Sequence, residues 1–153
     1  MHVKSYIQVA DNFTYGELYG HRPDNRPETV EQFLNLLYGT HKILQPIRRV
    51  FGAVHVSSGR RCKNYNRSVG GTLTSDHLTG NAFDIICTEA NITTVYRWAI
   101  DNLKYDKIIF ERRGKTHWLH ISFKRLGNNR QLSLVSLSAG NYAPYNGQNL
   151  EAR

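Results

Sequence analysis

The 153-residue sequence is poor in cysteine and has no long apolar run. Cys62 and Cys87 are the only cysteines, and they form no C-x-x-C pair, which excludes a disulfide framework and a thiolate metal site. We therefore expect two reduced, inert thiols, with one disulfide as the alternative. No stretch of about 18 apolar residues occurs, so the sequence predicts no transmembrane segment.

The first residues lack the features of a secretory signal. Residues 1–13 contain neither an apolar core nor a small-residue cleavage site. We therefore expect a protein that is made in the cytoplasm without a signal peptide.

Acidic residues are also scarce relative to basic ones. The chain has 20 Lys and Arg against 12 Asp and Glu, a formal net charge of +8. This excess favours polyanionic partners, such as nucleic acid, acidic membranes or the anionic polymers of a bacterial wall, and charge alone does not choose among them. Because the basic residues are scattered and form no known recognition motif, we expect no specific nucleic-acid partner.

Length and composition predict one globular domain over residues 1–153. Within it, we expect an irregular N-terminal arm over residues 1–26 and a Gly- and Asn-rich C-terminal tail over residues 138–153. We also expect a monomer.

Hydrophobic periodicity predicts an α+β fold with a small, mainly antiparallel sheet and flanking helices. Pro46 should kink or split the longest helix, because it lacks an amide hydrogen. The expected helices cover residues 28–50 and 61–68, and a third helix that runs to Leu103 is capped by Thr88 or Asn91. The expected strands cover residues 53–58, 82–87, 107–111, 118–123 and 130–137, with a basic loop over residues 112–116.

The most informative stretch runs from Ser75 to Asp84. His77 and Asp84 flank Gly80, which permits a tight turn, so both side chains could converge on one point. Asp84 lies in an apolar strand, where a carboxylate is costly unless a cation or a hydrogen-bond donor compensates for it.

A second stretch, residues 117–123, contains His120 in an alternating strand. Together with His77 and Asp84, His120 completes a set of two imidazoles and one carboxylate, which suits one Zn²⁺ ion and leaves a fourth position for water. His117 would face the opposite side of a regular strand. It could act as a general base only from the loop or from a bulge.

These stretches occur in the order of a known family. The sequence resembles the zinc D-Ala-D-Ala carboxypeptidases, which share the hedgehog signalling fold and include phage endolysins that cut L-alanyl-D-glutamate bonds. The resemblance covers about residues 13–124. The motifs that carry it are Ser57-Ser58-Gly59-Arg60-Arg61, Asn66, Gly70-Gly71, Ser75-x-His77-x-x-Gly80-x-Ala82-x-Asp84 and Trp118-Leu119-His120-Ile121-Ser122.

The resemblance implies a role for each motif residue. It places His77, Asp84 and His120 as zinc ligands, Arg61 near the scissile carbonyl, and Ser75 in substrate binding. Many relatives carry Glu or Asp where this chain has His117, whereas a histidine there is similar to the carboxypeptidase branch. Glu111, at the end of the preceding strand, is therefore the alternative base.

We expect hydrolysis of peptide bonds in peptidoglycan stem peptides, by a D,D-carboxypeptidase or an endopeptidase. Such an enzyme would act at the cell wall after release by lysis, as a bacteriophage lytic enzyme does, or as part of a virion. The alternative is a non-catalytic, zinc-stabilised module of the same fold that binds the wall. The motifs do not determine which peptidoglycan bond is cut.

Overall fold

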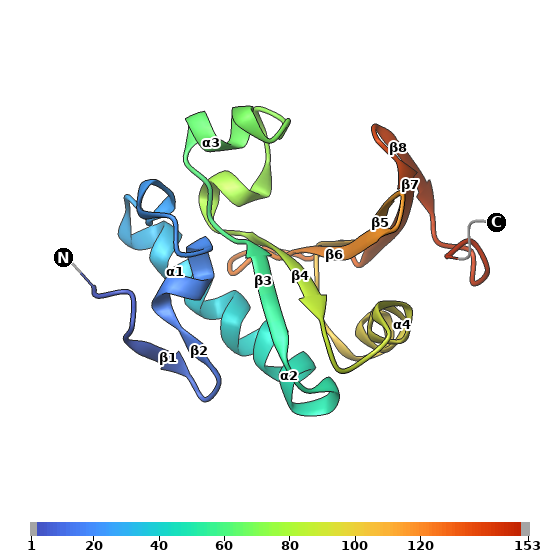
Figure 1. Cartoon of the computed structure of the whole chain (residues 1–153), viewed down its shortest axis with the longest axis horizontal. Helices are drawn as coiled ribbons and strands as arrows, with labels where there is room; N and C mark the ends of the chain where they lie inside the picture. The colour runs from blue at the N-terminus through green and yellow to red at the C-terminus, as the bar shows by residue number, and fades with distance from the viewer. Residues whose placement is uncertain (1–2, 151–153) are drawn as a thin grey trace.

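A six-stranded sheet forms the centre of the molecule in the computed structural model, which describes residues 3–150. Every neighbouring pair of strands is antiparallel except β5 and β7, which are parallel. The α+β class and the mainly antiparallel sheet are thus confirmed (Figure 1). The strands lie in the order β3 (Val54–Ser58), β4 (Ala82–Cys87), β6 (Thr116–Ser122), β5 (Lys107–Arg113), β7 (Leu132–Ser138) and β8 (Asn141–Pro144).

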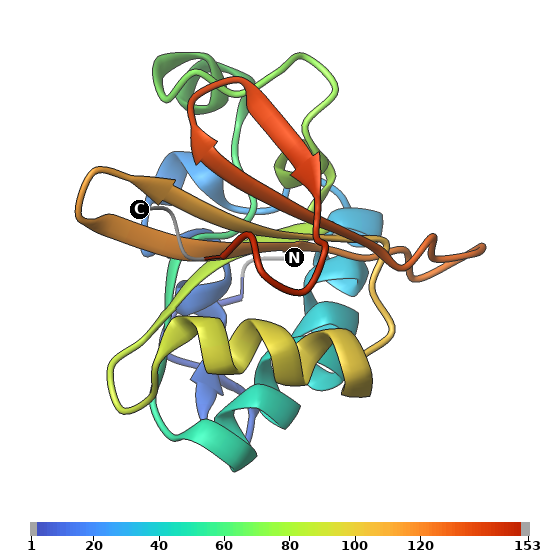
Figure 2. The ribbon, with the colours of Figure 1, turned by 90° about the vertical axis from the view of Figure 1, so that its right-hand side faces the viewer.

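Helices cover one face of this sheet and leave a cleft on the other. In Figure 1, α2 (Gln45–Phe51) and α4 (Ile92–Asn102) lie below the strands, and the short α3 (Lys63–Ser68) lies above them. Figure 2 shows the β7–β8 hairpin rising on the same side as α3. Among the described residues, no helix is long and apolar enough to cross a membrane.

The expected helix over residues 28–50 is one run in three parts. It begins with α1 (Val30–Gly39), where the Thr29 hydroxyl accepts a hydrogen bond from the Gln32 amide, and it widens into a π-helical turn, Thr40–Leu44, before α2. The wide turn ends at Leu44, two residues before Pro46, which cannot donate a backbone hydrogen bond to the previous turn. The expected helix is thus continuous, with a change of helix type before Pro46 rather than a break.

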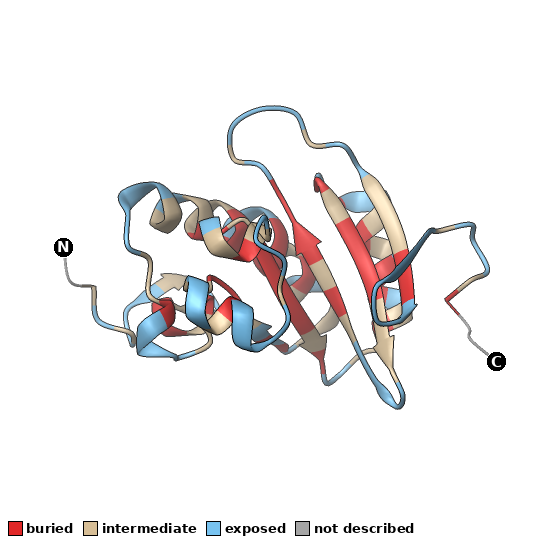
Figure 3. Cartoon of the chain, turned by 90° about the horizontal axis from the view of Figure 1, so that it is seen from above, coloured by how far each residue is buried: buried red, intermediate tan, exposed pale blue. Residues whose placement is uncertain are grey.

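The sheet has one apolar face that is buried against the helices and one face that lines the cleft. Phe83, Ile85, Leu119 and Ile121 point to the helices and are fully buried. Because side chains alternate along a strand, Asp84 and His120 point to the opposite face, toward the cleft. Figure 3 shows the buried positions along the central strands.

The N-terminal arm is more ordered than the sequence predicts. It forms a small hairpin, β1 (Gln8–Ala10) with β2 (Phe13–Thr14), and two 3₁₀ turns, η1 (Tyr15–Tyr19) and η2 (Pro23–Asn25). The side chains of Phe13, Tyr15 and Tyr19 pack into the core, and the Arg60 amide donates to the Leu18 carbonyl at 3.0 Å. The arm thereby supports the loop that follows β3.

The C-terminal tail is also partly regular. β7 continues to Ser138 and turns at Gly140 into β8, which pairs with it antiparallel. Residues 151–153 of the expected tail lie outside the described residues. Cys62 and Cys87 are both free thiols, as expected, and burial raises the pKa of Cys87 to about 11.

Candidate metal centre and active site

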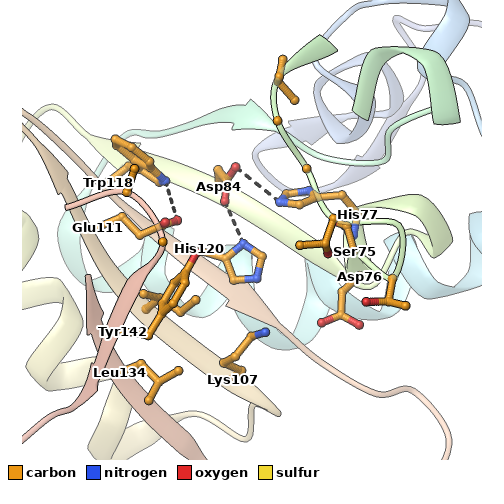
Figure 4. Close-up of a pocket in the computed structure, with 18 of the residues that line it drawn as sticks. Ser75, Asp76, His77, Asp84, Lys107, Glu111, Trp118, His120, Leu134 and Tyr142 are labelled. Carbon is orange, nitrogen blue, oxygen red and sulfur yellow. Dashed lines mark hydrogen bonds and ion pairs between the residues drawn. The ribbon is translucent and has the colours of Figure 1, made fainter. Parts of the chain in front are cut away.

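Three side chains from three separate elements meet on the cleft face of the sheet (Figure 4). Asp84 in β4 and His120 in β6 lie directly opposite each other in the strand register. His77 lies in the 3₁₀ turn η4 (Asp76–Thr79), which Gly80 ends in a left-handed conformation with φ of 77°. This turn reverses the chain into β4 and brings His77 beside Asp84.

The three groups are close enough to share one ion. Asp84 Oδ2 lies 3.3 Å from His77 Nε2, and Asp84 Oδ1 lies 3.0 Å from His120 Nδ1. One potential ligand atom from each residue lies within 4.8 Å of the other two. Two imidazoles and a carboxylate are a donor set typical of zinc sites that retain an open position.

The hydrogen bonding of His77 supports a metal at this point. Its Nδ1 lies 2.7 Å from the Gly59 carbonyl oxygen, which can only accept, so Nδ1 carries the proton. Nε2 is then an unprotonated nitrogen, and it is buried without a hydrogen-bond partner. A buried lone pair directed at a carboxylate is unfavourable unless a cation lies between them, so these residues fit a bound metal ion.

Burial and charge shift the pKa values of these groups in the direction that metal binding requires. Burial of the imidazole lowers the pKa of His77 and favours the neutral form. Burial alone would raise the pKa of Asp84. The neighbouring imidazoles of His77 and His120 outweigh that effect, so the pKa of Asp84 lies well below its usual value. A neutral imidazole and an ionised carboxylate are the forms that bind metal.

Arg61 binds the same carboxylate oxygen of Asp84 that faces His77. Its Nη2 donates to Asp84 Oδ2 at 2.9 Å, and its Nε donates to Ser58 Oγ at 2.8 Å. A weaker contact joins Nη1 to Asn66 Oδ1 at 3.3 Å. Arg61 also lines the cleft, so it orients the carboxylate and still faces the space where a substrate would lie.

Ser75 lies at the rim of the same cleft. Its Oγ accepts a hydrogen bond from the His77 amide at 3.3 Å and caps the η4 turn. This contact gives Ser75 a role in positioning His77, in addition to its exposure to the cleft.

Glu111 in β5 enters the cleft beside the three residues. Its Oε2 accepts a hydrogen bond from Trp118 Nε1 at 2.9 Å, and its Oε1 lies 3.6 Å from Arg113 Nη2. Burial is the largest influence and raises the pKa of Glu111, although the charge of His120 opposes the shift. A partly buried carboxylate with a raised pKa suits a general base near neutral pH.

The structure does not bring His117 to this site. Strand β6 begins at Thr116 and is regular there, so His117 pairs with Arg112 and faces the opposite side of the sheet from His120. Its ring stacks on Phe110 with centroids 6.2 Å apart, and it lines a separate cavity. A turn at Gly114 and Lys115 replaces the expected five-residue loop, which leaves no bulge to redirect His117.

The cleft around the candidate metal site has a volume of about 850 Å³. The loop over residues 69–75 and η4 form one wall, and β7 and β8 form the other. Sequence reasoning missed several residues of the second wall and the floor. Of these, Lys107 could have been predicted, because it lies on the same face of its strand as Glu111. The missed residues include Lys107, Arg130, Leu132, Leu134 and Tyr142.

Comparison with known proteins agrees with this geometry. The family model of peptidase M15 matches residues 11–122, which include all three candidate ligands and Glu111. No curated protein matches the sequence. The chain belongs to the peptidase M15 family. Its members are zinc D-Ala-D-Ala carboxypeptidase-type enzymes, so the chain is a peptidase with a His-Asp-His group that could bind a metal.

Proposed function

We propose that this protein is a zinc-dependent peptidase that cleaves peptide bonds in the stem peptides of bacterial peptidoglycan. The proposal rests on one observation. His77 Nε2 is buried without a hydrogen-bond partner, beside Asp84 and His120 at the floor of an open cleft. His77, Asp84 and His120 would hold one ion, and the cleft gives a substrate access to them. Such an ion supplies Lewis acidity, which polarises a carbonyl group and lowers the pKa of water.

Glu111 is the proposed general base. Its Oε1, which does not accept the Trp118 hydrogen bond, takes a proton from the attacking water and returns it to the leaving amine. Trp118 orients the carboxylate during both transfers, and Arg113 limits its movement on the other side. His117 has no part in this step because it faces the other side of the sheet.

Arg61 and Ser75 are the proposed substrate-binding residues. The Arg61 guanidinium neutralises Asp84 and faces the cleft, where it would stabilise negative charge on the oxygen of the scissile carbonyl. Ser75 offers a hydroxyl at the rim for a backbone group of the peptide.

The charge of the chain supports a substrate embedded in an anionic wall. A net charge of +8 would concentrate the protein on wall polymers, and this attraction would weaken as salt is added. The proposal therefore includes action at the cell wall, as a lytic enzyme would require.

Digestion of purified peptidoglycan tests the proposal. We expect wild-type protein to release peptide fragments that mass spectrometry identifies, with release abolished by a chelator and restored by added zinc. Glu111→Gln should bind the wall without releasing fragments. If the wild type binds zinc and the wall but releases nothing, the protein is a binding module and the proposal is wrong.

A further inference from the structure

The β7–β8 hairpin adds to the cleft a wall that the family match does not include. The match ends at residue 122, whereas β7 and β8 span Leu132–Ser138 and Asn141–Pro144. Leu132, Leu134 and Tyr142 from this hairpin all line the cleft. Figure 4 shows Leu134 and Tyr142 in this wall. Features of the substrate that contact this wall are therefore recognised by residues outside the matched region.

The strand register defines an apolar strip that leads from the metal centre to this wall. His120 pairs with Ile109, which in turn pairs with Leu134. Neighbouring strands are about 4.8 Å apart, so Leu134 lies about 10 Å from His120, across the strands. This strip suits the methylene groups of an aliphatic side chain.

Most charged groups of the cleft are neutralised within the protein. Three arginines that line it each have an acidic partner: Arg61 with Asp84, Arg113 with Glu111, and Arg130 with Asp106. Asp106 also has Lys124 at 3.5 Å. Each of these three arginines therefore has an acidic partner within the protein.

Lys107 and Asp76 differ from those groups. Lys107 lies in β5 beside Leu132, and Asp76 lies in η4 on the facing wall. Within residues 3–150, no carboxylate lies at ion-pair distance from the Lys107 ammonium, and no cation lies at that distance from Asp76, although the charge of Asp76 acts on Arg130. Figure 4 shows the Lys107 side chain directed toward the wall that carries Asp76.

Two opposite charges are thus held apart in one cleft, at the side of an apolar strip. Partly buried charges without partners are unfavourable, and a ligand that carries both complementary charges would satisfy them together. A substrate carboxylate would bind Lys107, and a substrate ammonium group would bind Asp76.

We propose that Lys107 and Asp76 form a specificity subsite for a zwitterionic amino-acid centre at the end of an aliphatic side chain of the substrate. This inference rests on the proposed peptidase function and narrows its substrate. Within stem peptides, it selects a diamino-dicarboxylic residue over a lysine residue.

Three synthetic stem peptides that differ only at the third residue test the subsite. The first carries diaminopimelate, the second carries lysine, which lacks the distal carboxylate, and the third carries 2-aminopimelate, which lacks the distal ammonium. We expect kcat/KM of the wild type to be about 10-fold or more higher for the first peptide than for either other peptide, because each loses a charged hydrogen bond.

Two variants test which residue binds which charged group of the substrate. Lys107→Gln should lose the preference for diaminopimelate over lysine and keep the preference over 2-aminopimelate, and Asp76→Asn should show the reverse. Lys107→Arg should retain the preference over lysine. Lys104→Gln is the matched control, because Lys104 is exposed outside the cleft and its loss lowers the net charge equally.

The outcomes separate this inference from the peptidase proposal. Equal kcat/KM for the three peptides, or a Lys107→Gln variant that keeps the preference over lysine, would overturn the subsite while leaving the peptidase intact. If no peptide is cleaved, calorimetric titration of the wild type with the same peptides decides the matter, and equal Kd values overturn the subsite. Zinc content and melting temperature, measured for each variant, identify any that are misfolded or have lost metal.

Discussion

Trp118 and Glu111 are cross-strand partners in β6 and β5, and the indole Nε1 donates a hydrogen bond to Glu111 Oε2 at 2.9 Å. The indole therefore holds the carboxylate on the cleft face of the sheet, beside His120. His117 precedes Trp118 and points to the other face. Adjacent residues of β6 therefore face opposite sides of the sheet. Trp118 positions Glu111 in the cleft, and His117 has no access to the cleft.

Replacing Glu111 with Gln should lower kcat by roughly 100- to 10,000-fold, the usual contribution of a general base. His117→Gln, the matched control on the other face, should leave kcat close to that of the wild type. Fragment release from peptidoglycan, measured by mass spectrometry, checks both variants. A large loss in His117→Gln with an active Glu111→Gln would reverse our assignment of the base.

Trp118→Phe should move the acidic limb of the pH profile to higher pH. Burial raises the pKa of Glu111 and the Trp118 hydrogen bond lowers it, so removing the indole N–H raises the pKa further. A higher pKa means that the ionised, basic form of Glu111 is lost at a higher pH as the solution is acidified. The measurement is kcat/KM against pH, with Trp98→Phe as a control far from the cleft. An unchanged acidic limb would show that this carboxylate does not control the rate.

Zinc should bind to metal-free protein with a stoichiometry of one ion per chain and should raise the melting temperature. The ion binds the folded state and not the unfolded chain, so it shifts the folding equilibrium. Asp84→Asn should greatly weaken this effect, whereas His117→Gln should retain it. Elemental analysis and thermal unfolding with added zinc provide the measurements, and full zinc binding by Asp84→Asn would contradict the assigned ligand set.

Metal-free protein should lose stability as the pH is lowered below about 6.5, the usual pKa of histidine. Because burial lowers the pKa of His77 in the folded state, the unfolded chain binds a proton more readily in this range. The stabilisation that neutral His77 gives to the folded state is therefore fully present above about pH 6.5 and is lost as the pH falls below it. Urea unfolding of wild type and His77→Gln at several pH values checks this, and parallel pH dependences in the two proteins would contradict it.

Gly59→Ala should destabilise the fold by about 1–3 kcal/mol, as overpacking in a well-packed region does. A Cβ atom at Gly59 would lie 1.9 Å from the Leu18 carbonyl oxygen, so the N-terminal arm would have to move. The Gly59 carbonyl also faces His77 Nδ1, so zinc affinity should fall as well. Urea unfolding and zinc titration measure the two effects. A variant with wild-type stability would show that the arm does not pack tightly on this loop.

The sequence by itself determined the elements that local patterns encode. Alternation placed His120 on one defined face of its strand, periodicity predicted the long helical run, and Gly80 indicated the turn between His77 and Asp84. These features depend on residues a few positions apart, so a single sequence is enough to predict them.

Tertiary structure alone decided which face each remaining residue presents and which distant segments meet. The two-residue turn before β6 set the register that turns His117 away and leaves Glu111 in the cleft. Parallel pairing of β7 with β5 placed Leu134 and Tyr142 opposite η4, and aromatic packing ordered the N-terminal arm. Strand register and long-range pairing depend on which distant surfaces become buried together, and short-range sequence patterns do not specify that.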